Sequence, residues 1–522
     1  MNQCVFIPCA GVGSRLGSLT TSVNKALVSV DNRPIISHII DKCPSNSEFV
    51  IALGYKGEFL RDYLELVYPK TKFNFVQIKT FEGPSSSLGL TVLSCREFLQ
   101  RPFVFVSCDT IIDEKIPVVE SNWIGYSDNS ASEQYRKIRI EHGKVTSILE
   151  KTEEVGLDAF NYIGLAGVFN FEAFWKAMDS SAGDELIKGE IQGIDGLVFD
   201  NLIPIRFSWH DAGNTIELEK AREYFQSEFQ PNILEKSSEA IWFVDDLVIK
   251  FSTDTNFIQN RVKRSELLDG YVPKIISSNK NMYCYKKAKG SVLSEVISVP
   301  LFDLLLNRSI EFWDSENFIQ FNNSDFENRC RKFYLNKSLE RVELFYKTFK
   351  RSDHNEVIND KESELLSELL EQVDWNFISH GTPGRVHGDF HFENILFDKD
   401  VSNFTFLDWR QDFGGSLEVG DIYYDLAKLL HGLIVSHEIV TSNHFRITWT
   451  NNEINYDFYR KNILVECEEY FYKWLERNGF DVKKVRIITA LIFLNIAPLH
   501  HNPYSLLLFA LGKSMLSEEM RS

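Results

Sequence analysis

The chain has 522 residues, of which 44% are hydrophobic and 25% are charged, and its formal net charge is -18. This length exceeds that of one ordinary domain, and the apolar content is sufficient for at least two cores. Because nucleic acids and anionic membranes attract basic surfaces, the net charge argues against both as general partners.

The cysteine pattern and the apolar runs indicate the compartment. The eight cysteines never fall in a C-x-x-C pair, which favours reduced, buried thiols over a disulfide framework or a zinc site. The first nine residues lack the basic start and long apolar region of a secretory signal, and no apolar run approaches the ~20 residues of a membrane span. We therefore expect a cytoplasmic protein with small-molecule substrates, no nucleic acid and no membrane partner. A homo-oligomer is left open.

Strand and helix patterns alternate along the first 110 residues. The expected strands are residues 4–9, 48–53, 73–78 and 103–107, and the expected helices are residues 35–42 and 57–67. Strands separated by helices predict an α/β domain with a mainly parallel, Rossmann-like sheet, whose ligands bind beyond the carboxyl ends of the strands. A further helix at 215–228 precedes Pro231, where we place the boundary between domains 1–230 and 231–522.

The pattern changes after the boundary. Residues 240–244 and 247–251 read as strands around an acidic turn, a helix is expected at 257–268, and a hairpin-like run follows at 282–287. The remainder is mostly helical, with a loop-and-strand insert at 387–412. A small β lobe before a large helical lobe predicts a bilobal, protein-kinase-like fold.

A glycine-rich segment, G-V-G-S-R-L-G-S-L-T, occupies residues 11–20 directly after the first expected strand. Glycines let the backbone turn tightly, so that successive N–H groups can point at phosphate oxygens, and cationic side chains add the charge that a triphosphate needs. The candidate residues for these tasks are Gly11, Gly13, Ser14, Arg15 and Lys25. A bare G-x-G would fit a plain strand-to-helix turn, but the longer pattern is far more specific.

This segment resembles the opening motif of the sugar-phosphate nucleotidylyltransferase family, with Ser18 and Asn24 in place of two prolines. Other family motifs have counterparts in the same order at residues 53–56, 83–88, 107–109, 150–152, 189–195 and 209–213. The resemblance covers roughly residues 1–225. In this family an acceptor phosphate attacks the α-phosphorus of a nucleoside triphosphate, and pyrophosphate leaves.

The resemblance implies a role for each matching residue. Arg15 and Lys25 would be catalytic, Asp109 and Asp211 would hold Mg²⁺, and Gly83 would lie near the base. The acceptor-binding residues would be Glu150, Lys151 and Glu190. Taken singly, Asp109 fits a helix cap, Asp211 fits a turn, and Lys151 fits a solvated surface position. The altered Gly83 loop leaves the base open, with CTP or UTP favoured.

A second motif, H-G-D-F-H-F-E-N, spans residues 387–394 and is followed by F-L-D at 406–408. A kinase needs an acidic group for the proton of the attacking hydroxyl, and Asn and Asp oxygens for Mg²⁺ on ATP. The alternative is an incidental polar loop. The motif resembles the aminoglycoside phosphotransferase and choline kinase family, which implies that Asp389 is the catalytic base and that Asn394 and Asp408 bind the metal.

The same resemblance extends over about residues 233–435. The carboxylates of the G-D-x-x-x-D-L-A segment at 420–427 are expected to brace the catalytic loop, and His391 is interpreted as an ordinary loop residue. Lys250 resembles the nucleotide-binding lysine of V-A-I-K, and Glu266 is its expected partner, although no glycine-rich loop precedes Lys250.

Together the motifs predict a bifunctional enzyme: a kinase that phosphorylates a small sugar or alcohol with ATP, and a nucleotidyltransferase that couples the phosphate to a second nucleotide. The product would be an NDP-sugar or CDP-alcohol for a surface or capsule polysaccharide, with a sugar-like acceptor favoured. One alternative is a phosphocholine- or phosphoethanolamine-type cytidylyltransferase with a choline-type kinase. Another is that one domain is degenerate and regulatory. A nucleic-acid nucleotidyltransferase is disfavoured by the charge.

Overall fold

The computed structural model describes residues 2–83, 86–128, 134–151, 159–180, 189–226, 238–314, 323–436, 438–439 and 442–521. The chain divides into two compact units. The first comprises Met1–Thr255 and Ile276–Tyr285, and the second comprises Asn256–Ile275 and Lys286–Ser522. The expected boundary residue Pro231 lies outside the described residues, so the division at residue 230 stays a prediction.

The first unit is built on a nine-stranded sheet. Seven strands follow the order β10-β9-β11-β6-β1-β4-β5, β8 pairs with β11, and β12 pairs with β8. The strands are β1 (Cys4–Cys9), β4 (Glu48–Leu53), β5 (Lys72–Gln77), β6 (Phe103–Val106), β8 (Trp123–Ser127), β9 (Lys137–Glu141), β10 (Lys144–Leu149), β11 (Ala159–Val168) and β12 (Ile203–Arg206). Its centre is parallel, because β1 pairs with β4 and β6, and β4 pairs with β5. This confirms the predicted α/β class, while β9, β10 and β11 add an antiparallel side.

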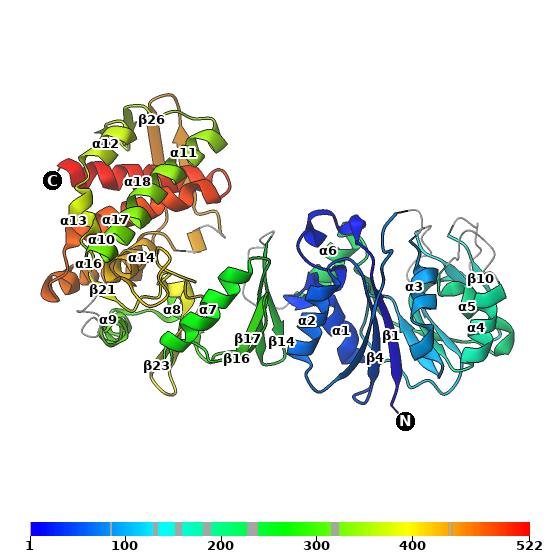
Figure 1. Ribbon diagram of the computed structural model, residues 1–522. Helices are drawn as coiled ribbons and strands as arrows, with labels where there is room; N and C mark the ends of the chain where they lie inside the picture. The colour runs from blue at the N-terminus through cyan, green and yellow to red at the C-terminus, as the bar shows by residue number, and fades with distance from the viewer. Residues whose placement is uncertain are drawn as a thin grey trace. The chain divides into compact units, whose positions relative to one another are not determined.

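Helices cover both faces of this sheet (Figure 1). They are α1 (Ile35–Lys42), α2 (Gly57–Val67), α3 (Leu88–Ser94), α4 (Phe171–Ser180), α5 (Ile191–Asp195) and α6 (Thr215–Phe225). The alternation of side chains along β1 explains the two layers. Val5 and Ile7 belong to the core that contains α1, α2 and α6, whereas Cys4 and Phe6 belong to the core that contains α3, α4 and α5.

A small four-stranded sheet also belongs to the first unit, with the order β14-β15-β17-β16. Its strands are β14 (Glu239–Val244), β15 (Leu247–Ser252), β16 (Ile275–Ser278) and β17 (Met282–Lys286). The predicted acidic turn is present, since Asp245 adopts φ 53° between β14 and β15. Trp242 and Phe251 of this sheet contact Tyr63 and Phe59 of α2, with ring centroids 5.3 and 5.1 Å apart. The small sheet therefore shares a hydrophobic core with the sheet of the first unit.

The second unit is mainly helical (Figure 1). Its helices are α7 (Thr255–Leu267), α8 (Leu293–Val296), α9 (Val299–Trp313), α10 (Asn323–Arg331), α11 (Lys337–Phe349), α12 (Leu366–Gln372), α13 (Trp375–Ser379), α14 (Ile422–Ile434), α16 (Asn462–Arg477), α17 (Val482–Ile496) and α18 (Tyr504–Arg521). Its strands are β18 (Ser291–Val292), β19 (Glu356–Ile358), β20 (Lys361–Ser363), β21 (Pro383–Gly384), β22 (Ile395–Asp398), β23 (Asn403–Phe406), β24 (Gly420–Asp421), β25 (Phe445–Trp449) and β26 (Glu453–Phe458). The predicted helical lobe with a loop-and-strand insert is therefore confirmed.

The cysteines and the helices agree with the sequence patterns. All eight cysteines are buried and free, as expected of reduced thiols. Among the described residues, no helix combines the length and the apolar character needed to cross a membrane.

Candidate active sites

The glycine-rich segment follows β1 and leads into a short 3-10 helix, Ser14–Thr20. Gly13 adopts φ 70°, and a Cβ atom there would lie 3.1 Å from the Cβ of Lys25, so a side chain at this position would be both strained and crowded. Asn24, which stands in place of a family proline, is buried and donates from its amide to the carbonyls of Cys9 (2.9 Å) and Tyr55 (2.7 Å). It thereby fixes Lys25 relative to the end of β1.

Asp109 and Asp211 lie together at the carboxyl side of the sheet. The strands β7 (Thr110–Ile112) and β13 (Trp209–Asp211) pair antiparallel and bring the two aspartates to one end of the ladder. A Cβ atom on Gly213 would lie 2.8 Å from an oxygen of Asp109 and 2.9 Å from an oxygen of Asp211, so both carboxylates flank the same point. Asp211 also accepts hydrogen bonds from the Tyr135 hydroxyl (2.8 Å) and the Gly213 N–H (2.9 Å).

Lys25 neutralises one of these two carboxylates. Its Nζ lies 2.5 Å from Asp109 Oδ2, and Arg15 lies 4.0 Å from the same oxygen with a side chain that is 64% exposed. Burial alone would raise the pKa of Asp109, but Lys25 lowers it to about 2. The pKa of Asp211 is raised by burial and next by Asp109. The carboxylates of Asp109 and Asp211 flank one point, and this donor set fits a Mg²⁺ ion that is also bound by phosphate oxygens.

The expected acceptor residues lie on separate segments. Glu190, immediately before α5, is buried, and burial raises the pKa of its carboxyl group. Glu150 accepts from Arg136 at 3.3 Å, whereas Lys151 is exposed. Gly83, with φ 84°, accepts at its carbonyl from the Ser86 hydroxyl just before α3 (2.8 Å). The neighbouring motif residues Pro84, Ser85 and Thr152 lie outside the described residues.

In the second unit, Asp389 is the centre of a hydrogen-bonded cluster. Asn394 donates to Asp389 Oδ2 (3.2 Å), His391 Nε2 lies 3.6 Å from the same oxygen, and Lys428 Nζ lies 2.7 Å from Oδ1. Burial would raise the pKa of Asp389, but Lys428 and His391 hold it well below its usual value. Burial would lower the pKa of His391, yet Asp389 raises it to about 9, so the ring is charged at neutral pH. His391 is therefore part of this cluster rather than an ordinary loop residue.

The catalytic loop is braced by buried polar groups. Asp425 on α14 accepts from the N–H groups of His387 and Gly388 at 2.7 Å each, which confirms the predicted bracing role for this carboxylate. For Asp421 the prediction is wrong, because its carboxylate accepts from Thr382, Tyr423 and Tyr334 instead. Arg264 on α7 donates to the carbonyls of Arg410 (2.5 Å), Leu417 (3.0 Å) and Val386. These contacts fix the chain on both sides of the loop.

The other residues predicted for the kinase site lie on separate elements. Asp408 follows β23 with φ 57° and pairs with Arg261 of α7 at 3.1 Å. Asn394 uses its amide N–H groups toward Asp389, and its side-chain oxygen makes no hydrogen bond within the described part of the chain. The oxygens of Asn394 and Asp408 are a suitable donor set for Mg²⁺. Lys250 is buried on β15 of the first unit and Glu266 is exposed on α7 of the second, so their pairing stays a prediction.

Comparisons with known proteins find similarities to both halves of the chain. Residues 333–451 match the phosphotransferase enzyme family APH. The bifunctional protein GlmU of Methanococcus maripaludis is 24% identical over 258 residues, which are 47% of this chain and 60% of that protein. A probable glucose-1-phosphate cytidylyltransferase of Bacillus subtilis is 34% identical over 85 residues, or 16% of this chain and 33% of that protein. The CTP:phosphocholine cytidylyltransferase LicC of Streptococcus pneumoniae superposes with a TM-score of 0.35 at 17% identity, over 43% of this chain and 100% of that chain.

The chain joins a nucleotidyltransferase-like half to a phosphotransferase-family half. It spans only about 60% of the length of the GlmU relative.

Sequence reasoning missed several residues of both halves. In the nucleotidyltransferase-like half, Tyr135 contacts Asp211 from 76 positions away, and no local pattern marks it. In the phosphotransferase half, Lys428 follows the bracing Asp425 by three positions on α14. Residues spaced in this way share one helix face, which was the available signal.

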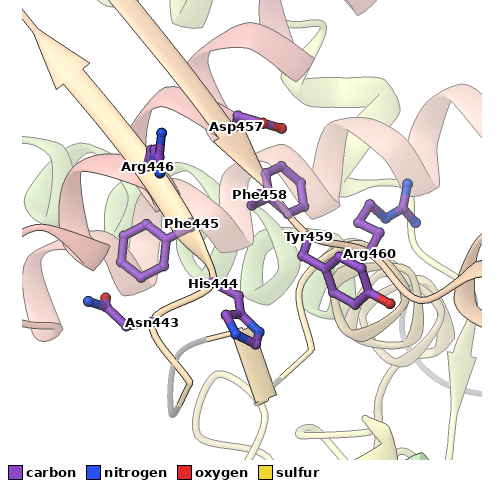
Figure 2. Close-up of a pocket in the computed structure, with 8 residues that line it drawn as sticks. All are labelled: Asn443, His444, Phe445, Arg446, Asp457, Phe458, Tyr459 and Arg460. Atoms are coloured by element: carbon purple, nitrogen blue, oxygen red, sulfur yellow. The ribbon is translucent and has the colours of Figure 1, made fainter.

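A separate hollow of about 630 Å³ lies on the β25–β26 hairpin of the phosphotransferase half (Figure 2). Its lining residues are Asn443, His444, Phe445, Arg446, Asp457, Phe458, Tyr459 and Arg460. Phe445 packs against Tyr504 of α18 with ring centroids 5.8 Å apart. None of the predicted site residues lines this hollow.

Proposed function

We propose that the chain catalyses two consecutive transfers: phosphorylation of a small hydroxyl compound, and then coupling of that phosphate to a nucleotide. The observation that carries the proposal is the presence of both sites on one chain, each built on an aspartate that pairs with a lysine, Asp109 with Lys25 at 2.5 Å and Asp389 with Lys428 at 2.7 Å. A phosphate monoester is what a phosphotransferase makes from an alcohol, and it is also the nucleophile that a nucleotidyltransferase uses.

In the first transfer, the acceptor hydroxyl attacks the γ-phosphorus of ATP. The new O–P bond forms, the bond from the γ-phosphorus to the bridging oxygen of ADP breaks, and the hydroxyl proton moves to the Asp389 carboxylate. Asn394 and Asp408 would hold Mg²⁺, which when bound neutralises charge on the phosphates. Lys250, supported by Glu266, would bind the α- and β-phosphates.

In the second transfer, an oxygen of the acceptor phosphate attacks the α-phosphorus of a nucleoside triphosphate, and pyrophosphate leaves. The phosphate is already a nucleophile, so alignment and charge neutralisation matter more than a strong base. Lys25 would move from Asp109 toward the reacting phosphates, and Arg15 would stabilise the leaving pyrophosphate. Asp109 and Asp211 would hold Mg²⁺ between them.

The other predicted residues complete the nucleotide and acceptor sites. Backbone N–H groups at Gly11, Gly13 and Ser14 would bind the triphosphate, and Gly83 would lie beside the base. The acceptor would contact Glu150, Lys151 and Glu190. CTP or UTP is the proposed second nucleotide, since the names of relatives include a cytidylyltransferase and a uridylyltransferase that act on glucose 1-phosphate. The product would be an NDP-sugar or CDP-alcohol for a surface polysaccharide.

Pyrophosphate release by the purified chain tests this function. CTP, UTP, GTP, ATP and dTTP are crossed with sugar phosphates and phospho-alcohols in the presence of Mg²⁺. We expect one productive nucleotide and acceptor pair, whose dephosphorylated acceptor then supports ADP release from ATP. Pyrophosphate release with a pair whose dephosphorylated acceptor gives no ADP release would contradict the consecutive order. Absence of release with every pair would contradict the transferase assignment of the first half.

A further inference from the structure

Positively charged side chains gather around Asp389 in the second unit. Lys428 on α14 is buried and reaches Asp389 Oδ1 at 2.7 Å. Lys337, the first residue of α11, lies over the ring of Phe333 with its Nζ 4.7 Å from the centroid. The guanidinium of Arg410 lies over the same ring at 5.1 Å. Lys337 and Arg410 therefore both lie against the buried ring of Phe333, near the pair formed by Lys428 and Asp389.

The backbone is shaped to place these cations. A π-helical segment, Lys332–Asn336, carries Phe333 and ends directly before Lys337. Such segments are rare and occur frequently at functional sites. Gly388 adopts φ 86°, and a Cβ atom there would lie 2.7 Å from the Cβ of Arg410, so only glycine leaves room for Arg410 beside the catalytic loop.

The cations lack sufficient counter-charge from the protein. Within the described residues, neither Lys337 nor Arg410 forms an ion pair, and the buried Nε of Arg410 has no hydrogen-bond partner. Burial, followed by the neighbouring Arg410, Lys428 and Arg341, lowers the pKa of Lys337 to about 7. Close cations repel one another, and at Lys337 the carboxylate of Asp389 offsets only part of this effect. An anionic ligand would remove this repulsion.

The two carboxylate oxygens of Asp389 face different groups. Oδ2 faces Asn394 at 3.2 Å, which is a predicted ligand of the metal on ATP. Oδ1 faces Lys428 at 2.7 Å. Lys428 therefore lies at the carboxylate oxygen of Asp389 that does not face the expected metal ligand.

We propose that the acceptor of the phosphotransferase half is a hydroxyl compound that also carries an anionic oxo group, which is a carboxylate, a phosphate or a phosphonate. Lys337 and Arg410 bind this group, and Lys428 is a positioning residue for Asp389. The planar guanidinium of Arg410 can donate two parallel hydrogen bonds to such a group. Neutral and quaternary ammonium alcohols lack it. This inference rests on the proposed phosphotransferase function.

Matched acceptor pairs test the inference with the full-length chain. ADP release from ATP is measured with D-glycerate against glycerol, D-gluconate against D-glucitol, and 2-hydroxyethylphosphonate against choline. We expect kcat/KM to be at least about 10-fold higher for the charged member of a pair, as for a charge-assisted bond to substrate. A preference for the neutral or cationic member overturns the inference while leaving the phosphotransferase function intact.

Two variants separate acceptor binding from ATP binding. Lys337→Met and Arg410→Gln should each raise the KM for the anionic acceptor about 10-fold and change the KM for ATP less than about two-fold. Lys347→Met, at an exposed position of the same helix α11, is the matched control and should change neither value. A higher KM for ATP with an unchanged KM for the acceptor would assign the cations to ATP and overturn the inference.

If no acceptor in the panel reacts, calorimetric titration of the full-length chain with malonate decides. We expect the wild type to bind malonate, and the double variant K337M/R410Q to lose that binding while still binding ATP. A wild-type chain that binds ATP but not malonate overturns the inference alone. A wild-type chain that does not bind ATP overturns the proposed phosphotransferase function as well.

Discussion

Each half of the molecule pairs a lysine with a key aspartate, but different groups surround the two ion pairs. In the first unit, Lys25 and Asp109 are 2.5 Å apart, and a second carboxylate, that of Asp211, lies beside them. In the second unit, Lys428 and Asp389 are 2.7 Å apart, and His391 lies beside them with Glu393 3.3 Å from its Nδ1.

The difference shows that a lysine–aspartate ion pair alone does not determine what a site can bind. In the first site two carboxylates flank one point, which suits a cation that accompanies a triphosphate. In the second, Lys337 and Arg410 lie against one ring near the pair formed by Lys428 and Asp389, which suits an anion. Under the two proposals, the same pair of residue types serves a metal ion in the first site and a charged acceptor in the second.

The largest expected effect is the loss of one activity without the other. Asp389→Asn should lower the ATP-dependent phosphorylation rate about 1,000-fold, because the variant cannot take up the hydroxyl proton. Pyrophosphate release by the same protein should stay within about two-fold of the wild type. Asp109→Asn is the matched variant and should give the reverse result. A loss of both activities in either variant would show that the two sites do not work independently.

Replacement of Lys25 sharpens the comparison at the first site. Lys25→Met removes the cation beside Asp109, and pyrophosphate release should fall about 100-fold, because a charge aimed at the reacting phosphates is lost. ADP release by the second site is the internal control. A rate that stays near that of the wild type would show that Lys25 only balances Asp109 and does not reach the phosphates.

Replacement of Lys428 should change both the rate of phosphorylation and its dependence on pH. Lys428 lowers the pKa of Asp389, so Lys428→Met should raise that pKa. In the proposed mechanism the deprotonated form of Asp389 takes up the hydroxyl proton, so the acid limb of kcat/KM for phosphorylation should shift to higher pH. His391 and Asn394 still face Asp389 and keep part of its low pKa. An unchanged acid limb with a lower rate would limit Lys428 to a structural role.

The sequence predicted elements whose signals are local. The helices Ile35–Lys42 and Gly57–Val67 and the strand Glu48–Leu53 have the predicted bounds, because side-chain periodicity and glycine turns are written within each segment. The docking of Trp242 against Tyr63 was not predictable, since it depends on how two apolar faces meet across 179 positions, and no periodicity encodes that choice.

The candidate site residues also divide into those with a local sequence signal and those positioned only by tertiary packing. Asp109, Asp211, Asp389 and Asn394 were found because they stand in contiguous motifs, and the structure brings each pair together. Arg264 was missed because it acts from a helix more than a hundred positions before the carbonyls that it binds. Burial of a guanidinium is decided by tertiary packing, and sequence spacing carries no record of it.

The smallest expected effect concerns stability in the first unit. Burial lowers the pKa of His38 to about 4, and its ring lies 3.0 Å from the Val30 carbonyl. The folded pKa is below the ordinary value of 6.5, so the unfolded state binds more protons as the pH falls below 6.5, and stability is lost there. At pH 5.5 this loss amounts to about 1.4 kcal/mol relative to pH 7.5.

His38→Gln removes this titration, so the stability difference between pH 7.5 and 5.5, measured by urea unfolding of the first unit, should shrink by about that amount. His354→Gln, at an exposed position of the second unit, is the control and should leave the difference unchanged. His387 in the second unit is also buried, and burial lowers its pKa to about 3, so the second transition should keep its pH dependence in the His38 variant. Unfolding that becomes less pH-dependent in both transitions would mean that the two units unfold together, and the stabilities of the two sites could then not be varied separately.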